Sequence, residues 1–314
     1  MTTTALVTGA AGFAGSHLLD LLGADDVQIT AWHRPGGTPP RATPRTTWVG
    51  VDLLDRQAVR EAFEHFAPDV VYHCAGAPSV GHSWSTTEST FAINVRATHH
   101  LVDALRARGQ PARLMLVSSG MVYASSAEAL SERSPVQPAS PYALSKLAQE
   151  LVASEDADPI QVSIARAFNH LGPRQAAGFV AADFARRIAD IEAGRAPAEI
   201  AVGNLAARRD LTDVRDTVRA YRLIGLRGQH GRVYNVCSGR TVVIRDLLDM
   251  LLARTNVPIT VRIDPARFRP IDQTVVLGDA GRILSELGWK PEIPLERTLD
   301  DLLAYWRQRA TGDS

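Results

Sequence analysis

The sequence of 314 residues predicts an α/β fold, a doubly wound parallel sheet with a smaller substrate lobe interleaved with it in the second half. Two observations carry this prediction. Short apolar runs alternate with amphipathic stretches through the first half, which is typical of strands and helices alternating in a parallel sheet. A glycine-rich turn, TGAAGFAG, follows the first apolar run and opens the first amphipathic stretch.

The first half contains a regular series of strands and helices. The helix expected at residues 140–153 begins with Ser140 and Pro141, a common pair at a helix start. Strands that alternate with helices in this way predict a Rossmann sheet covered on both faces. The other helices are expected at 14–22, 56–66 and 91–108, and the strands at 5–8, 27–32, 70–74, 113–118 and 162–167.

The pattern becomes less regular after Asn169. Helices are expected at 179–193, 213–226 and 244–254, strands at 200–203 and 233–238, and a mixed region with several prolines beyond 259. We therefore predict a dinucleotide-binding domain at residues 1–170, with returns to the sheet at about 200–238. Residues 171–314 are expected to form mainly the substrate lobe.

The charge balance restricts the partners. The 34 basic and 34 acidic residues cancel without like-charge blocks, so neither nucleic acid nor an anionic membrane is expected as a partner. Cys74 and Cys237 lie in apolar runs and are expected to be small buried residues, and no metal site is expected among the scattered histidines. With no leader or membrane-span pattern, we expect a soluble cytoplasmic protein that binds small molecules.

The glycine-rich turn predicts a nucleotide cofactor. Glycines at the mouth of a helix let the backbone approach a pyrophosphate, which then lies at the helix N-terminus. The spacing here is G-x-x-G-x-x-G, so the position of the turn directly after a strand matters more than the motif itself. The residues predicted to bind the cofactor in this turn are Gly9, Gly12, Phe13 and Gly15.

The end of the second strand indicates which cofactor is bound. An enzyme selective for NAD usually offers an acidic residue to the ribose there, whereas this chain has His33 and Arg34. A guanidinium can bind a 2′-phosphate through paired N–H donors. We therefore prefer NADP(H) over NAD(H). The alternative is that Arg34 simply ends the strand and points to solvent.

Tyr142 and Lys146 share a helix face because they are four residues apart. The lysine charge is expected to lower the pKa of the phenol, which would make the tyrosine an acid or base near neutral pH. The alternative is an ordinary surface helix with an extended lysine. The glycine-rich turn and Ser119, at the end of the strand 113–118, favour a catalytic role.

These motifs together resemble the extended short-chain dehydrogenase/reductases that act on nucleotide sugars, nearly from end to end. The second half most resembles the members that handle GDP-linked 4-keto-6-deoxyhexoses. The matching segments are TGAAGFAG, the pair Asp52-Leu53, HCAG at 73–76, FAINVRAT around Asn94, VSSGMVY at 117–123, SPYALSK at 140–146, ARAFNHLGP at 165–173, RRDLTDVRD at 208–216 and RPIDQTVVLGD from 269.

The resemblance implies a role for each matching position. Ser119, Tyr142 and Lys146 would form the catalytic set, and Asn94 would steady the helix that carries the last two. The cofactor would also contact Asp52, Leu53, Ala75, Gly76, Asn94, Tyr142 and Lys146. The sugar nucleotide would be held by Asn169, Arg209, Arg269 and Asp272, besides Ser119. For Arg209, an ion pair with Asp210 or Asp213 is the alternative. The same resemblance implies a homodimer.

Met121 distinguishes between reactions within the resembling family. Dehydratases of the family carry an acidic residue in this segment, and a thioether can neither donate nor accept a proton at neutral pH. The sequence therefore favours NADP(H)-dependent reduction of the 4-keto group of a nucleoside-diphosphate 6-deoxyhexose. The alternatives are a 4-epimerase with tightly bound NAD and, less favoured, a 4,6-dehydratase or a relative without catalytic activity.

Overall fold

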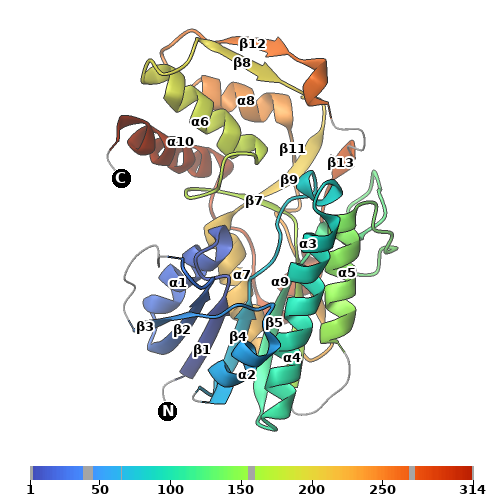
Figure 1. The fold of residues 1–314 in the computed structure, drawn as a ribbon. Helices are drawn as coiled ribbons and strands as arrows, with labels where there is room; N and C mark the ends of the chain where they lie inside the picture. Colours follow the sequence, from blue (N-terminus) through green and yellow to red (C-terminus); the bar gives the residue numbers. More distant parts are fainter. Residues whose placement is uncertain (1–2, 38–44, 65, 155–159, 269–272, 313–314) are drawn as a thin grey trace.

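A computed structural model of the protein describes residues 3–37, 45–64, 66–154, 160–268 and 273–312. The lower part of the molecule in Figure 1 is a parallel sheet of seven strands, in the order β10-β6-β5-β4-β1-β2-β3. This order, which reverses direction between β1 and β4, confirms the expected Rossmann fold. The strands are β1 (Thr3–Thr8), β2 (Val27–His33), β3 (Thr46–Gly50), β4 (Val70–His73), β5 (Ala112–Ser119), β6 (Ile160–Ala167) and β10 (Val233–Val236).

Helices bury the sheet on both faces. Successive residues of a strand point to opposite faces, so Ala5 and Val7 of β1 enter one hydrophobic core and Leu6 enters the other. The first core is formed with α1, α7 and α9, and the second with α2, α4 and α5. The six helices are α1 (Phe13–Gly23), α2 (Arg56–Glu64), α4 (Ala97–Ala107), α5 (Pro141–Ala153), α7 (Val214–Arg227) and α9 (Gly281–Leu287).

A second, smaller lobe lies above the carboxyl edge of the sheet in Figure 1. Its core is formed by three helices and by short strands, with Ile200, Leu247 and Leu299 fully buried among them. The helices are α6 (Val180–Glu192), α8 (Ile244–Leu252) and α10 (Leu295–Thr311). The strands of this part are β7 (Asn169–Leu171), β8 (Glu199–Val202), β9 (Arg208–Asp213), β11 (Thr241–Val243), β12 (Thr260–Ile263) and β13 (Val275–Val276), and short 3-10 turns lie at His82–Trp84, Gly120–Val122 and Pro265–Arg267.

The helix expected at residues 91–108 is interrupted in the structure. It consists of α3 (Thr87–Phe91), a π-helical turn at Ala92–Arg96, and α4. The wider turn contains Asn94, whose side chain is fully buried. Hydrophobic periodicity does not reveal such a turn, because it adds one residue without changing the apolar pattern on either side, and turns of this kind are frequent at functional sites.

The chain returns to the Rossmann sheet in its second half. Within the region 200–238, α7 and β10 make this return, whereas the strand expected at 200–203 is β8 and pairs with β12 in the upper lobe. A later return had no signal in the mixed region beyond 259: Ile283 and Leu287 of α9 and Trp289 pack in the first core of the sheet. The two domain boundaries themselves stay a prediction.

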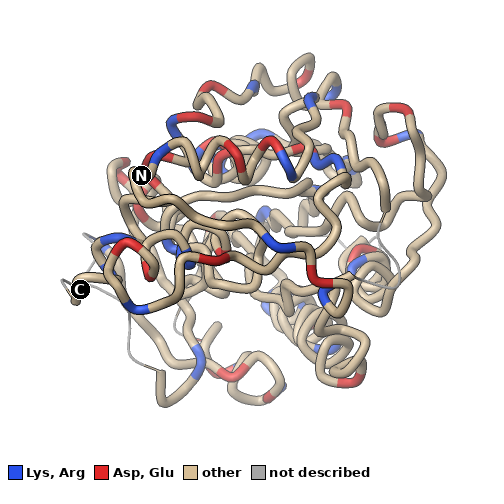
Figure 2. The backbone as a smooth tube through the Cα atoms, turned by 90° about the horizontal axis from the view of Figure 1, so that it is seen from above, with Lys and Arg blue, Asp and Glu red and all other residues tan. Residues whose placement is uncertain are grey.

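Basic and acidic residues are interspersed along the backbone in Figure 2, with no block of a single sign. This distribution agrees with the zero formal net charge of the sequence. Within the described part of the chain, none of the helices combines the length and the apolar character that crossing a membrane requires.

Candidate active site

The glycine-rich turn lies at the carboxyl end of β1, where β1 and β4 diverge. Gly9 adopts a positive φ of 63°, and a Cβ there would lie 2.6 Å from the backbone nitrogen of Ala75. A Cβ at Gly15 would overlap the carbonyl oxygen of Gly9. Gly12 begins α1, and no side chain caps the helix. The first N–H groups of α1 are therefore not satisfied by a capping side chain, which suits a helix terminus that receives phosphate.

The residues predicted for the adenosine end of the cofactor lie beside this turn. The N–H of Ala10 donates to the carbonyl oxygen of Trp32 at 3.4 Å, so His33 and the exposed Arg34 follow the turn closely in space. The N–H of Val51 donates to the carbonyl oxygen of His33 at 3.0 Å, which places Asp52 next to them.

Asp52 and Leu53 fix the turn that follows β3. The Oδ1 atom of Asp52 accepts from the N–H of Leu54 at 2.9 Å, and the carbonyl oxygen of Leu53 lies 3.0 Å from Nδ1 of His100 on α4. The contact with His100 joins the turn after β3 to α4, which packs beside α5, the helix that carries Lys146.

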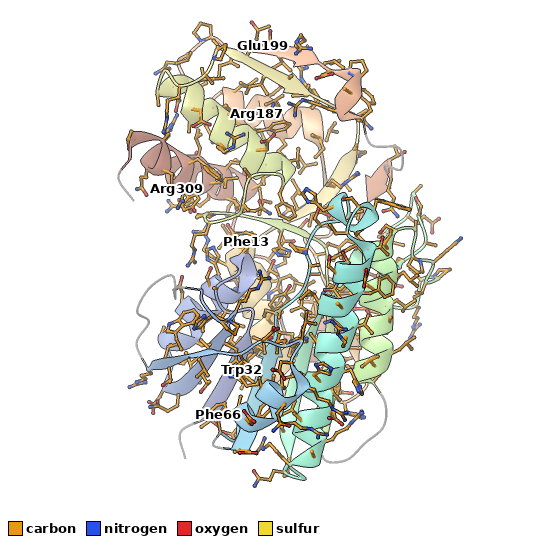
Figure 3. The ribbon with its side chains drawn as sticks, viewed as in Figure 1. Phe13, Trp32, Phe66, Arg187, Glu199 and Arg309 are labelled. Carbon is orange, nitrogen blue, oxygen red and sulfur yellow. The ribbon has the colours of Figure 1, made fainter. Side chains whose placement is uncertain are left out.

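Phe13 makes the contact between the glycine-rich turn and the upper lobe. Its ring stacks on His170 of β7 with 5.7 Å between centroids and 7° between planes, and it meets His17 edge-on. Figure 3 labels Phe13 at this boundary between the lobes. Burial lowers the pKa of His170, opposed by a hydrogen bond to the carbonyl oxygen of Phe168, so the histidine is a neutral packing partner here.

Asn94 joins the loop after β4 to helix α5. Its Oδ1 accepts from the N–H of Ala77 at 2.8 Å, and its Nδ2 donates to Oγ of Ser145 at 2.8 Å. A Cβ at Gly76 would lie 2.9 Å from this oxygen and 3.1 Å from Nζ of Lys146. Glycine at position 76 therefore lets the Asn94 amide and the Lys146 ammonium approach the backbone closely, and Asn94 joins α5 to this loop.

Helix α5 begins where the sequence indicates. Ser140 caps it by accepting from the N–H of Ala143 at 3.1 Å, and Pro141 occupies the first turn. The N–H of Tyr142 donates to Oγ of Ser83 at 3.1 Å. Tyr142 thus lies in the first turn of the helix. Lys146 follows one turn later and is buried against the sheet.

Ser119 and Tyr142 meet at the end of β5. Burial raises the pKa of Tyr142 above the ordinary value for a phenol, and a hydrogen bond with Ser119 acts in the opposite direction. Oγ of Ser119 also accepts from the N–H of Met121 at 3.2 Å. The tyrosine therefore keeps its proton at neutral pH and is placed as a proton donor beside a second hydroxyl.

The contacts of Lys146 differ from those expected from the sequence. The Nζ atom of Lys146 donates to the carbonyl oxygen of Val117 at 3.0 Å and to Oε1 of Gln149 at 2.9 Å. Burial lowers the pKa of Lys146 to about 8, opposed by Cys74 and Glu150. The expectation that the lysine lowers the pKa of Tyr142 is wrong for this arrangement, because burial dominates and the ammonium is directed to other oxygens.

Glu150 and Arg166 are part of the site, and the sequence reasoning missed them. Arg166 of β6 donates from Nε and Nη2 to both carboxylate oxygens of Glu150, at 2.9 and 2.6 Å, and both side chains are nearly inaccessible. The hydroxyl of Ser118 also donates to Glu150. A signal was available, since Gln149 and Glu150 follow Lys146 by three and four residues and so share its helix face.

The residues predicted to hold the sugar nucleotide lie on adjoining strands of the upper lobe. Asn169 is exposed at the start of β7 and pairs with Leu211 of β9, and Arg209 lies two residues earlier on β9. Arg209 donates from Nη1 to the carbonyl oxygen of Gln273 at 2.7 Å. Arg269 and Asp272, predicted for the same role, lie outside the described residues.

The carboxylates suggested as alternative partners of Arg209 are engaged elsewhere. Asp210 is buried and accepts from the N–H groups of Ser238, Gly239 and Gly278 at 2.7 to 3.2 Å. Asp213 pairs with Arg215 at 2.7 Å. Both carboxylates therefore have hydrogen-bond or ion-pair partners of their own, and the role of Arg209 in holding the nucleotide stays a prediction.

A cavity of about 430 Å³ is lined by the connection between Ser119 and Ser140 and by the segment before β13. The lining residues are Ala124, Ser125, Gln137, Pro138, Ala139, Gln273 and Thr274. The carbonyl oxygen of Gln273 accepts from Arg209, so this cavity borders β9.

A Rossmann sheet with serine, tyrosine and lysine at its carboxyl edge defines a short-chain dehydrogenase/reductase. The relatives of this chain in that class are enzymes that act on nucleotide sugars. The chain belongs to the family described as GDP-mannose 4,6 dehydratase, whose model matches residues 6–302. The family that the sequence motifs resemble is thereby confirmed.

Three relatives illustrate the range of similarity. A GDP-6-deoxy-D-mannose reductase of Pseudomonas aeruginosa is 36% identical, over 98% of this chain and 99% of the relative. The structure of RMD from Pseudomonas aeruginosa complexed with NADPH is 33% identical with a TM-score of 0.85, over 98% and 100% of the two chains. A UDP-glucose 4-epimerase of Thermus thermophilus complexed with NAD is 26% identical with a TM-score of 0.86, over 97% and 99%.

The conformation of the glycine-rich turn can be tested with two matched substitutions. Gly9 and Gly109 share a φ of 63°, but no atom lies within 4 Å of a Cβ built at Gly109. Gly109→Ala should lower the free energy of unfolding by about 1–2 kcal/mol through backbone strain alone. Gly9→Ala should cost at least about 3 kcal/mol, because overpacking against Ala75 adds to this strain. Urea unfolding of both variants measures the difference, and equal losses would contradict the close approach.

Proposed function

We propose that this protein reduces the 4-keto group of a GDP-linked 6-deoxy-4-keto-hexose with NADPH, as a GDP-6-deoxy-D-mannose reductase. The observation that carries the proposal is Tyr142, which keeps its proton at neutral pH and shares a hydrogen bond with Ser119, while Met121 stands where a dehydratase needs an acid or base. The 36% identical relative that carries this reductase name supports it.

The fit of the cofactor rests on the glycine-rich turn. Only glycine fits at positions 9 and 15 of this tight turn, and no side chain caps α1, so its first N–H groups remain for a pyrophosphate. Bound NADPH would supply the hydride for the carbonyl carbon. Arg34 and His33 favour the form with a 2′-phosphate, and the 33% identical structure, which is complexed with NADPH, supports this choice.

The residues of this chain would handle the oxygen of the substrate. Reduction turns the carbonyl oxygen into an alkoxide, which needs hydrogen-bond donors as its charge develops. Tyr142 would give its phenolic proton to this oxygen, and the Ser119 hydroxyl would donate a hydrogen bond to the same atom. Lys146 would supply positive charge beside the reacting groups. Asn169, Arg209, Arg269 and Asp272 would hold the nucleotide and sugar, with two arginines suited to the diphosphate.

A 4-epimerase is the second candidate, because a UDP-glucose 4-epimerase bound to NAD has a TM-score of 0.86 to this chain. The two activities make opposite demands on the cofactor. A reductase consumes one NADPH for each product, whereas an epimerase keeps its NAD through the cycle. Arg34 and the absence of an acidic residue after β2 favour the reductase.

Tyr142→Phe is expected to abolish turnover without loss of cofactor. Removing the proton donor should lower kcat for NADPH-dependent reduction of GDP-4-keto-6-deoxymannose by about 10²–10⁴-fold. NADPH binding, followed by fluorescence, should be unchanged, because the ring and the fold are retained. The wild-type assay follows the absorbance of NADPH. Failure of the wild-type protein to reduce any 4-keto sugar, with interconversion of UDP-sugars at catalytic NAD, would support the epimerase instead.

Arg34→Ala is expected to weaken NADPH binding by about ten- to a hundredfold, since a charge-assisted hydrogen bond contributes about 1.5–3 kcal/mol. NADH lacks the 2′-phosphate and should lose much less affinity. Arg45→Ala is a control, because Arg45 is also exposed but pairs with Asp26 at 2.7 Å. Isothermal titration with both cofactors gives the comparison, and an equal loss for NADH and NADPH would remove the argument for NADP(H).

We propose that two copies associate through α4 and α5. Leu144 and Leu151 lie on one face of α5 and are 48% and 69% exposed, and nearby Trp84 is 56% exposed. A second copy would cover these large apolar side chains.

A cytoplasmic location is also proposed, supported by Cys74 and Cys237, which are both free thiols.

Leu151→Glu is expected to shift the protein from dimer to monomer, because it introduces a charge at the proposed interface. Leu284→Glu is the matched control: Leu284 is 51% exposed on α9, away from α4 and α5. Light scattering coupled to gel filtration measures both masses. A monomeric wild-type protein, or a dimer that survives Leu151→Glu unchanged, would contradict this arrangement.

A further inference from the structure

The ammonium of Lys146 is buried between two acceptors of different kinds. One is the backbone carbonyl oxygen of Val117, whose position is set by the sheet. The other is the side-chain amide of Gln149, which contacts Nζ through its Oε1 atom at 2.9 Å. An amide can present either an oxygen or an NH₂ group, so the orientation of Gln149 must be fixed by its surroundings.

Thr98 fixes that orientation. Its hydroxyl has a single hydrogen, which is donated to the carbonyl oxygen of Asn94 at 2.7 Å. The oxygen of Thr98 can then only accept from its other two partners, Nε2 of Gln149 at 2.8 Å and Nε2 of His73 at 2.9 Å. The NH₂ group of Gln149 is therefore directed to Thr98, and its oxygen is directed to Lys146.

His73 completes the same chain of hydrogen bonds. Burial lowers the pKa of His73 to about 3, and the charge of Lys146 acts in the same direction, so the ring is neutral. Its proton is on Nε2, which donates to Thr98, and Nδ1 accepts from the hydroxyl of Thr8 at 2.7 Å. Oγ1 of Thr8 in turn accepts from the N–H of Ala75 at 3.3 Å. Each hydrogen atom in this chain of hydrogen bonds therefore has one donor and one acceptor.

We infer that Gln149 is a positioning residue for Lys146, and that Thr98 and His73 orient it by a buried chain of hydrogen bonds that begins beside the glycine-rich turn. All three side chains are almost completely inaccessible. A buried polar group is costly when its hydrogen bonds are not satisfied, so the three groups hold one another in a single arrangement. That arrangement keeps a partial negative charge against the ammonium. Its importance for turnover rests on the proposed reductase function.

Other titratable groups face Lys146 and bear on its titration. Cys74, after β4, and Glu150, one turn later on α5, act to raise its pKa, while burial acts in the opposite direction. Glu150 is paired with Arg166 of β6, and His73 of β4 is neutral. Among the described residues, Nζ hydrogen-bonds to the backbone of Val117 and to the side chain of Gln149. A substitution of Gln149 can therefore change the polarity of a group in contact with Nζ without breaking the Glu150–Arg166 ion pair.

The chain is unusually suited to a direct measurement, because Lys146 and Lys290 are its two lysines. Isotope-labelled lysine therefore gives two side-chain NMR signals, and exposed Lys290 serves as the internal reference. Titration of the full-length protein reports the pKa of Lys146 with no substrate or cofactor. The result is independent of turnover, so failure of the proposed reductase activity would be seen separately in the NADPH assay.

Substitutions of Gln149 should move the pKa of Lys146 in opposite directions. Gln149→Leu removes an acceptor of the charged form, so the pKa should fall by about one unit or more. Gln149→Glu places a carboxylate there and should raise it. The fall in Gln149→Leu is the discriminating result, because a merely structural role of Gln149 would leave the pKa of Lys146 unchanged in a folded variant. The kcat pH profile of each active variant should shift in the same direction, with KM for the nucleotide sugar changed less than about threefold, a range set by losses below ~0.7 kcal/mol.

Substitutions of Thr98 test the orienting chain. Thr98→Val removes the acceptor of the Gln149 NH₂ group, so the amide can rotate and the pKa of Lys146 should fall as in Gln149→Leu. Thr98→Ser keeps the hydroxyl and should retain the wild-type value. An unchanged Lys146 titration in folded Gln149→Leu and Gln149→Glu would overturn the inference. If Thr98→Val does not fold, the Gln149 pair and Thr98→Ser still decide it.

Discussion

A cation buried beside a sheet must find its acceptors inside the protein, and the rest of the site depends on how Lys146 does so. An unpaired ammonium would cost several kcal/mol to desolvate. The hydrogen bond from Nζ to the carbonyl oxygen of Val117 fixes the height of α5 against β5, and the amide of Gln149, on the same helix, supplies a second acceptor. Tyr142 lies one turn earlier on the same helix, so the position of the lysine also determines where the phenol meets Ser119.

The next turn of α5 reinforces this registration. Glu150 forms a buried, two-point ion pair with Arg166 of β6, and the guanidinium also lies 4.8 Å from the centre of the Tyr123 ring. Removing one partner of such a pair usually costs about 3–5 kcal/mol, because the other charge is left buried. Helix α5 is thus held by charge at two successive turns, while Asn94 joins it to the loop that faces the cofactor turn.

The glycine-rich turn also links the two lobes. Phe13 stacks on His170, and Arg174 donates to His17 of α1 and pairs with Asp20 at 2.7 Å. Burial lowers the pKa of His17 to about 4, so the histidine is neutral and can accept from the guanidinium. The helix whose first turn would receive the cofactor phosphates is therefore in contact with the segment that follows Asn169. The elements proposed to bind substrate and cofactor are thus in direct contact.

The Rossmann sheet and the glycine-rich turn could be predicted from the sequence, because they follow from local periodicity and turn chemistry. Spacing along one helix likewise paired Tyr142 with Lys146. The π-helical turn at Ala92–Arg96, and the chain from His73 through Thr98 to Gln149, depend on tertiary packing. The hydrogen-bonded pairs His73–Thr98 and Thr98–Gln149 are separated by 25 and 51 residues in the sequence, so no local pattern indicates them. The same reason explains the tyrosine: four-residue spacing suggested a lowered pKa for Tyr142, but the burial of its ring, which depends on the whole fold, raised it.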